Sequence, residues 1–222
     1  MWDWGAFFHY LHNSYLLLGA GVTLALALAS LAIGLVCGTV AALMRMSAKP
    51  VLSKPAQFYI WLMRGTPVLV QLIIIYTGLP QLGIRLNVIE SSLLGLGLNE
   101  GAYLAEIIRA GILSVPRGQS EAAATVGLSG VRAAFLIVLP QALRVALPAS
   151  GGQYQTLAKA SSLAAAIGYP DVMQIVGGTV LSQTGQALEA MALVVVLYAA
   201  INLSIAFVVN LANRRLVKRH GR

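Results

Sequence analysis

A lysine, two serines and a glutamine fall close together in an apolar part of the chain. Lys159 is followed by Ser161 and Ser162, and Gln153 lies shortly before it. An ammonium group inside a bilayer costs about 2.5–3.5 kcal/mol, so it usually faces a water-filled cavity or a partner. This set suits the binding of a carboxylate or an amide. The alternative is a lysine that pairs with an acid on another helix or with backbone carbonyls, and the residues leave both open.

A second candidate set is Arg64 and Thr66, in the sequence Arg-Gly-Thr-Pro. Gly65 and Pro67 interrupt a helix and free backbone groups, which membrane proteins tolerate only beside other protein or a wet cavity. A guanidinium there can hold the α-carboxylate of an amino acid through two parallel hydrogen bonds. The alternative is an arginine in a kinked helix whose side chain extends to the membrane surface.

Three more charged residues fall within a single apolar segment. Glu106 and Arg109 are three residues apart and therefore share one face of a helix, where we expect an ion pair. Glu100 is expected either to face a polar pathway or to meet Lys159 from another helix.

The sequence lacks the residue patterns that metal binding, nucleotide binding and nucleophilic catalysis require. Cys37 is the single cysteine and the three histidines are not grouped, so we expect no metal site and no cofactor. The sequence contains no Gly-Lys pair and hence no phosphate-binding loop of the G-x-x-x-x-G-K type. It also contains no nucleophile elbow. We therefore expect a protein that is not itself an enzyme.

The chain that carries these residues has too few charged side chains to cover the surface of a soluble globular domain. Of its 222 residues 58% are hydrophobic and only 10% charged, whereas soluble domains have about a quarter charged. The composition predicts an all-α membrane protein with five transmembrane helices, since a helix needs about 20 mainly apolar residues to cross. The predicted spans are residues 15–44, 57–79, 88–113, 145–169 and 190–213. Residues 172–188 are expected to form a short interfacial or re-entrant helix and not a sixth span.

The basic residues predict the orientation of these spans. Eleven of the fifteen Lys and Arg residues lie at 45–54, 117–144 and 214–222, with Glu121 the one acid among them. Short loops rich in Lys and Arg remain in the cytoplasm, so we place both loops and the C-terminus inside. The N-terminus, with Asp3 and no basic residue, is expected outside, which requires an odd number of spans. The net charge of +8 therefore indicates topology and not nucleic-acid binding.

Residues 117–140 form a long predicted cytoplasmic loop with two helices. Ser120 can cap a helix that begins at Glu121, where an acid is favourable, and the three alanines that follow are strong helix formers. Gly127 can end this helix in a left-handed turn. A second helix is expected before Pro140, which stops it. The small side chains leave a shallow surface for another protein, and the alternative is an amphipathic helix that lies on the membrane.

Seven residues of this loop follow the pattern E-A-A, three residues, G, nine residues, I, one residue, L-P: Glu121, Ala122, Ala123, Gly127, Ile137, Leu139 and Pro140. The pattern resembles the EAA loop of permease subunits of bacterial ABC importers. In that family the loop forms coupling helices that dock on the cytoplasmic ATPase subunit. The resemblance therefore implies an ATPase-coupling role for Glu121, Ala122, Ala123, Gly127 and Leu128.

Longer stretches resemble one subfamily of these permeases. Residues 58–80 and 101–123 are similar to polar amino acid permeases, which include the histidine and glutamine permeases. Residues 157–189 are similar to general L-amino acid and glutamate/aspartate-type permeases. Other members commonly have an acid where this chain has Ala160, and its absence argues against a cationic substrate. The resemblance implies import of glutamate, aspartate, glutamine or a broad range of L-amino acids across a bacterial inner membrane, with cystine or basic amino acids as the alternative.

The same resemblance implies a set of partners. These are two cytoplasmic ABC ATPase subunits, a periplasmic amino-acid-binding protein that docks near residues 171–186, and a second permease subunit, identical or related. Membrane lipid surrounds the chain. An ion-gradient-driven transporter is the alternative, but such proteins often show paired repeats of spans, which we do not find. A membrane scaffold is a third possibility. The predicted contacts with the amino acid are Arg64, Thr66, Gln153, Lys159, Ser161 and Ser162.

Overall fold

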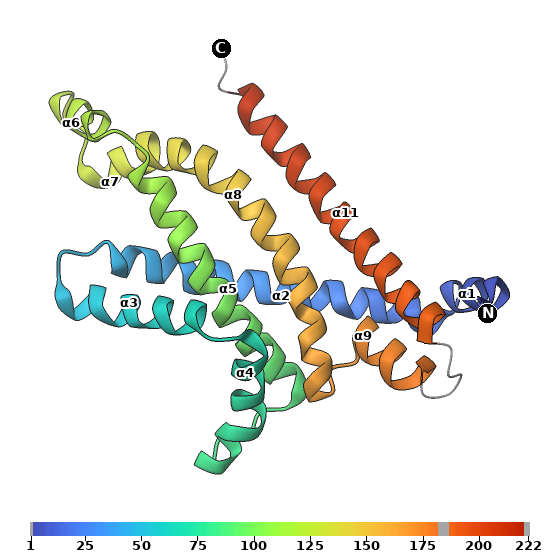
Figure 1. Cartoon of the computed structure of the whole chain (residues 1–222). Coiled ribbons are helices and arrows are strands. Elements are labelled where there is room, and N and C mark those ends of the chain that lie inside the picture. The colour runs from blue at the N-terminus through green and yellow to red at the C-terminus, as the bar shows by residue number, and fades with distance from the viewer. Residues whose placement is uncertain (1, 182–186, 220–222) are drawn as a thin grey trace.

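Four long helices form the body of the molecule, and every described element is helical. The computed structural model describes residues 2–181 and 187–219 of the chain. The long helices are α2 (Ser14–Arg45), α5 (Val88–Leu113), α8 (Leu139–Ala160) and α11 (Ala187–Arg219). Figure 1 shows the axes of α5, α8 and α11 in similar orientations, with the chain of α8 antiparallel to the other two, while α2 crosses them. The prediction of an all-α fold is confirmed.

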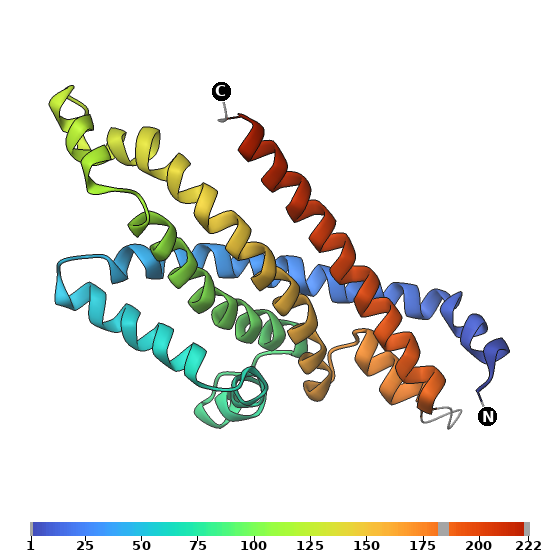
Figure 2. The ribbon, with the colours of Figure 1, turned by 45° about the horizontal axis from the view of Figure 1, so that its top comes forward.

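Short helices occupy the two ends of this bundle. One end carries α6 (Arg117–Thr125) and α7 (Gly130–Ala133), and α11 finishes at that end (Figure 2). The opposite end carries α1 (Trp4–Leu11) and α9 (Val172–Gln174). The predicted cytoplasmic loop and the C-terminus thus lie at the same end, as expected if both are on one side of a membrane.

Glycines allow α2 and α5 to pack in close contact. A Cβ atom at Gly34 would lie 2.8 Å from Cγ of Glu100, and one at Gly38 would lie 2.8 Å from the carbonyl oxygen of Gly101. Membrane helices associate through close van der Waals contact, which favours small residues where they meet. This glycine contact brings Glu100, which is almost fully buried, against the middle of α2.

The second predicted span, residues 57–79, is a bent pair of helices. α3 (Pro50–Gly65) meets the stretch from α4 (Val68–Ile73) to Leu82 at an angle of 108°. This stretch includes a π-helical turn, η1 (Ile74–Gly78), and a 3-10 turn, η2 (Leu79–Leu82). Pro67 has no N–H to donate and disfavours the helical conformation at Thr66, whose backbone is extended. The predicted interruption is confirmed, but a continuous helix across this span is not present.

Two amide side chains satisfy the backbone groups that the bend frees. The Gln71 amide donates to the carbonyl of Met63 at 2.9 Å and to the hydroxyl of Thr66 at 2.8 Å. The Asn99 amide, on α5, donates to the same Met63 carbonyl at 2.9 Å. It also donates to the Gln71 side-chain oxygen at 3.2 Å. Hydrogen bonds from Gln71, which is close in sequence, and from Asn99, which lies on another helix, therefore stabilise the bend.

Pro140 does not end the second helix of the loop, contrary to the prediction. The helical path continues from Gly130 to Ile167, through α7, a π-helical turn η3 (Ala134–Val138), α8 and η4 (Ser161–Ile167). Pro140 lies in the first turn of α8, where its missing N–H costs little and the wider π turn gives its ring room. The helix of the fourth predicted span therefore begins well before residue 145.

The segment after η4 folds back against α2 and α11. Asp171 is fully buried, and its carboxylate accepts hydrogen bonds from the Gln174 N–H at 2.9 Å and the Tyr198 hydroxyl at 2.8 Å. The hydroxyl of Thr23 accepts from the N–H of Val172 at 3.2 Å. The described part of residues 172–188 is thus short and helical, as expected, with a third π-helical turn, η5 (Ile175–Val180). Because Asp171 is buried, it cannot belong to the docking surface predicted at 171–186, and residues 182–186 lie outside the described chain.

Three of the described helical stretches are long and apolar enough to cross a membrane, namely Ser14–Arg45, Gly130–Ile167 and Ala187–Leu211. The bent pair of α3 and α4 makes a fourth if it is counted as one span. α5 has 26 residues and matches the predicted limits of 88–113, but it is not among these stretches, and it contains Glu90, Glu100, Glu106 and Arg109. The count of five spans therefore stays a prediction.

The contact between α2 and α5 predicts that Gly38→Ala lowers stability. The added methyl group meets a backbone carbonyl that cannot move aside, and overpacking of this kind costs about 1–3 kcal/mol. Thermal unfolding of the purified chain in detergent measures the effect. Gly21→Ala is the matched control on the same helix, because a Cβ atom there meets nothing within 4 Å. Equal unfolding midpoints for the two variants would contradict the proposed contact.

The hydrogen bonds at the bend predict that Gln71→Leu also destabilises the chain. Gln71 is buried, and its loss leaves the Met63 carbonyl with one donor fewer and the Thr66 carbonyl without its side-chain donor. Losing a partner of a buried polar group costs about 1–3 kcal/mol. The same unfolding measurement applies, with Gln81→Leu as the control, because Gln81 is exposed and lies beyond the bend. A midpoint for Gln71→Leu that equals the control would show that the amide does not hold the bend.

Candidate functional site

A polar pocket of about 230 Å³ lies where the bend between α3 and α4 meets α5 and α8. The bend contributes Thr66, Pro67 and Val68, so the extended backbone at Thr66 forms part of the wall. The side chains with polar atoms that line it are Thr66, Asn99, Glu100, Tyr103, Gln153 and Thr156. Three elements that are separate in the sequence therefore supply one polar site.

One face of α8 forms a wall of this pocket. Gln153, Thr156, Leu157 and Ala160 all line it. Their spacing of three, four and seven residues places them on a single helix face. The α8 wall of the pocket is therefore the helix face that includes Gln153.

Glu100 is the acidic group of the pocket. Its side chain is 1% exposed, and one carboxylate oxygen accepts a hydrogen bond from the Gln153 amide at 3.0 Å. The other oxygen accepts no hydrogen bond from any residue that the structure describes. Burial of a polar group without a partner costs free energy, so this oxygen is available to a hydrogen-bond donor on a ligand.

Arg64 lies beside the pocket and not in its wall. Its guanidinium carbon is 5.1 Å from the centre of the Tyr103 ring, and Tyr103 lines the pocket. A guanidinium at this distance from an aromatic ring is attracted to the ring face. Arg64 is also exposed, so its charge remains free to meet a ligand that enters past Tyr103.

The predicted substrate contacts divide into two groups in this structure. Thr66 and Gln153 line the pocket, and Arg64 adjoins it. Lys159 is exposed and is not among the lining residues. The Ser161 hydroxyl donates to the Ala158 carbonyl at 2.8 Å, and the Ser162 hydroxyl donates to the Lys159 carbonyl at 2.7 Å. Both serine hydroxyls are therefore used within their own helix.

The helical repeat explains why Lys159 lies apart from Gln153. Seven residues after Gln153 is Ala160, which shares its face, whereas Lys159 is turned by one residue away from it. Among the described residues no ion pair joins Glu100 to Lys159, and Glu100 is bonded to Gln153 instead. The other expectation for charged residues is confirmed, because Arg109 and Glu106 form an ion pair at 2.7 Å.

The residues missed from the sequence are Asn99 and Thr156. Thr156 lies three residues after Gln153 and so shares its helix face, whereas Asn99 is adjacent to Glu100 and lines the pocket because it packs against the bend. Neither is charged, and an uncharged polar residue in an apolar segment carries a weak signal. Their place in the pocket depends on the bend after Gly65. The sequence predicted the position of this bend but not its direction.

The loop between α5 and α8 presents α6 at one end of the bundle. Glu121 and Ala122 are exposed on it, whereas Ala123 is buried. Gly127 has φ +77, and the N–H of Leu128 donates to the Ala123 carbonyl at 3.0 Å, so the predicted left-handed turn is confirmed. Leu128, the last predicted coupling residue, is half-buried.

The predicted start of this helix was wrong. α6 begins at Arg117, after Pro116, and Ser120 therefore lies inside it and does not cap it. Proline holds the backbone in an extended conformation, and the chain turns helical directly after it.

Comparison with known proteins agrees with this architecture. Residues 34–218 match the family described as binding-protein-dependent transport system inner membrane component. The octopine transport system permease protein of Rhizobium meliloti is 41% identical over 206 residues, which cover 87% of this chain and 83% of that protein. The glutamate/glutamine/aspartate/asparagine transport system permease protein of Rhodobacter capsulatus is 45% identical over 124 residues, 55% of this chain and 29% of that protein.

A solved structure matches almost the whole chain. The crystal structure of an amino acid ABC transporter with histidines has a chain that is 33% identical, with a TM-score of 0.88, and the match covers 97% of this chain and 99% of that one. The family match, the relatives and the shared fold agree with each other and with the EAA-like loop. The chain therefore belongs to the family of binding-protein-dependent transport system inner membrane components, as a permease of the amino-acid ABC importer type.

Proposed function

We propose that the polar pocket between the α3–α4 bend, α5 and α8 is where this permease binds the amino acid that it imports. The observation that carries the proposal is the buried Glu100 carboxylate, which keeps one oxygen without a partner among the described residues. An amino acid brings an ammonium group that this oxygen can accept from. A charge-assisted hydrogen bond of this kind is stronger than one between neutral groups.

The second charge of the amino acid finds a complementary group in Arg64. The guanidinium lies against Tyr103 at the edge of the pocket and can bind a carboxylate through two hydrogen bonds. Glu100 and Arg64 thus offer one negative and one positive group to a zwitterion. Thr66 and Gln153 supply uncharged polar atoms between them.

The pocket favours an acidic or neutral polar side chain on the substrate. Ala160 lines the wall where subfamily members commonly place an acid, and Glu100 is the single carboxylate of the lining. A cationic side chain would have no second carboxylate to meet. We therefore propose glutamate, aspartate, glutamine or a broad range of L-amino acids, with basic amino acids or cystine as the alternative. The stated substrates of the relatives, octopine in one case and glutamate, glutamine, aspartate and asparagine in the other, allow either choice.

The charge distribution supports the orientation and the partners. With α6 and the basic C-terminus in the cytoplasm and the N-terminus outside, five spans cross the bacterial inner membrane. Two permease subunits, identical or related, would form the pathway, and two separate ATPase subunits would bind the exposed face of α6 and hydrolyse ATP. A periplasmic binding protein would deliver the amino acid to the opposite end of the bundle.

The mechanism follows from rigid-body coupling. Closure of the ATPases on ATP would move α6, and the continuous helical path from Gly130 to Ile167 would carry this movement to the Gln153 face of the pocket. Outward exposure of the pocket would admit the amino acid, and ATP hydrolysis would return the pocket inward.

Uptake by the reconstituted importer tests the pocket. The proteoliposomes contain this permease, the ATPase, the sister permease and the binding protein. We expect Glu100→Gln to lower ATP-dependent glutamate uptake about 10- to 100-fold, because this is the change in affinity that corresponds to the free energy of one hydrogen bond to a charged group. Lys159→Gln is the matched control, since Lys159 is exposed and outside the pocket. Loss of uptake in Lys159→Gln with Glu100→Gln unaffected would instead support the contacts of Lys159, Ser161 and Ser162 predicted from the sequence.

Coupling is tested on α6. Ala122 is small and exposed, so Ala122→Trp would block close approach of another protein without disturbing the fold. We expect uptake and substrate-stimulated ATP hydrolysis to fall more than about tenfold, since a misfitted interface loses several kcal/mol. Val51→Trp is the control, because Val51 is 83% exposed in the other basic loop region. Uptake that continues in Ala122→Trp, or that follows an ion gradient without ATP, would rule out ATPase docking at α6.

A further inference from the structure

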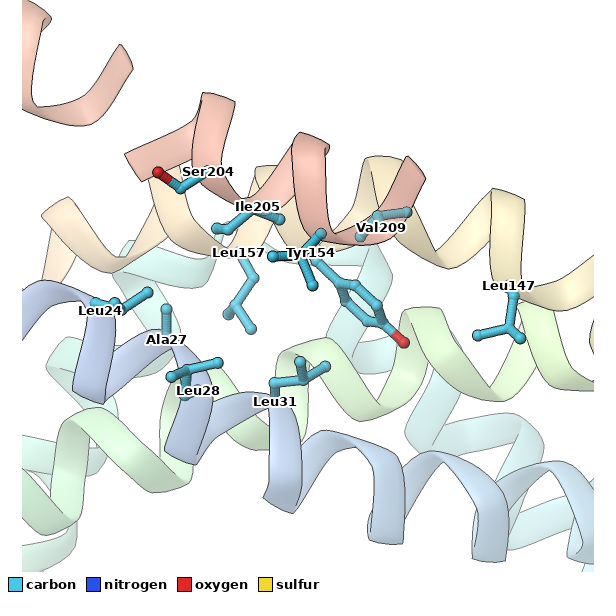
Figure 3. Close-up of a pocket in the computed structure, with 11 residues that line it drawn as sticks. Leu24, Ala27, Leu28, Leu31, Leu147, Tyr154, Leu157, Ser204, Ile205 and Val209 are labelled. Carbon is cyan, nitrogen blue, oxygen red and sulfur yellow. The ribbon is translucent and has the colours of Figure 1, made fainter. Parts of the chain in front are cut away.

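A second pocket, of about 450 Å³, lies between α2, α8 and α11 (Figure 3). Of the eleven residues that line it, only Tyr154 and Ser204 have a polar side-chain atom, and the others are aliphatic. Apolar cavities of about 150 Å³ stay dry and can hold a benzene-sized molecule, so this larger space suits a longer apolar ligand. A zwitterionic amino acid would find almost no hydrogen-bond partner here, which separates this pocket from the polar one.

The pocket opens toward the outside of the described bundle. Leu28 on α2 is 56% exposed and Val208 on α11 is 63% exposed, although both line the pocket. Figure 3 shows the Tyr154 ring in the space between α2 and α11, with Ser204 at the opposite edge from Leu147. All three helices belong to stretches that are long and apolar enough to cross a membrane, so an apolar opening between them is suited to contact with the hydrocarbon of the bilayer.

α8 and α11 meet closely at one side of this space. A Cβ atom at Gly151 would lie 2.5 Å from Cγ1 of Val209, which also lines the pocket. The absence of a side chain at Gly151 therefore allows the two helices to approach closely, and Tyr154, three residues later on α8, lines the pocket. The pocket is bounded by close helix contact and is not a loose gap at the surface.

A basic residue precedes the lining residue Leu147 on α8. Arg144 is exposed, and it lies three residues before Leu147, so the two share a face of α8. The sequence of α11 continues past Val209 to Arg214 and Arg215. On the proposed topology this is the cytoplasmic end, and basic groups between helices on that side attract anionic lipid head groups.

We propose that this pocket binds one acyl chain of an anionic phospholipid, with the lipid phosphate beside Arg144. The proposal rests on the topology given under the proposed function, but not on the identity of the amino acid. The aliphatic lining accepts the chain, and burial of each methylene group is favourable by about 0.8 kcal/mol. The charge of Arg144 selects an anionic head group over a zwitterionic one.

Photolabelling of the assembled importer tests this proposal. The probes are phosphatidylglycerol and phosphatidylcholine that carry the same photoreactive acyl chain, incorporated in nanodiscs with the permease and its ATPase. Ser204→Trp places an indole in the pocket, and Leu203→Trp is its matched control, since Leu203 is 71% exposed and does not line the pocket. Arg144→Gln removes the charge, and Arg144→Lys retains it.

We expect peptides of α8 and α11 around Tyr154 and Val209 to be labelled. Ser204→Trp should lower this labelling about tenfold, as expected for exclusion of a few methylene groups, and Leu203→Trp should not. Arg144→Gln should lower labelling by phosphatidylglycerol about fivefold and leave phosphatidylcholine unchanged. Thermal unfolding confirms that each variant is folded.

Three results would overturn the proposal. Equal labelling in Ser204→Trp and Leu203→Trp would show that the acyl chain lies elsewhere. Equal labelling by the two lipids in the unaltered protein would show that the head group is not selected. A disulfide between two copies of Ser204→Cys would show that a second permease subunit covers the pocket. Because the readout is lipid labelling and not uptake, failure here leaves the proposed amino acid site standing, and failure of the uptake test leaves this one standing.

Discussion

Backbone polar groups must be satisfied from within the protein wherever a helix is interrupted inside a bilayer. The chain has such an interruption at residues 66–67, where α3 and α4 meet at 108°. Gln71 and Asn99 donate to the carbonyl of Met63, and Gln71 also donates to Thr66. Pro67 interrupts the helix and these amides stabilise the resulting bend, which places Thr66 in the wall of the polar pocket beside α5 and α8.

The pocket depends equally on how closely α5 approaches α2. Glycines at positions 34 and 38 leave no room for a Cβ atom against Glu100 and Gly101. Close packing fixes the rotation of α5, so Glu100 is buried between helices and reaches Gln153 of α8. The hydrogen bond from Gln153 to Glu100 therefore links the two helices that carry most of the polar lining. The same α8 connects without a break to the loop that carries α6, which gives the coupling surface a rigid route to the pocket.

Two faces of α8 line two different pockets, one polar and one apolar. Leu157 lines both, while Gln153 and Thr156 face the polar one and Leu147 and Tyr154 face the apolar one. This division follows the helical repeat, because residues three or four positions apart share a face. α8 thus separates a space suited to a charged solute from a space suited to hydrocarbon. A rotation of this helix during transport would alter both.

Composition and charge pattern alone predicted an all-helical membrane protein, the limits of its first two long helices, α2 and α5, and a loop with a shallow surface for another protein. The resemblance of that loop to the EAA pattern implied that the other protein is an ATPase. These features depend on short-range properties: apolar length, helix propensity and the spacing of basic residues. The sequence also located the interruption at Gly65–Pro67 and the turn at Gly127, since glycine and proline restrict the backbone locally. Only the tertiary structure decided that Thr66, Glu100 and Gln153 share a pocket, that Lys159 does not, and that Pro140 continues a helix. Those outcomes depend on the direction of a bend and the rotation of packed helices, which are set by long-range contacts such as Asn99 with Met63.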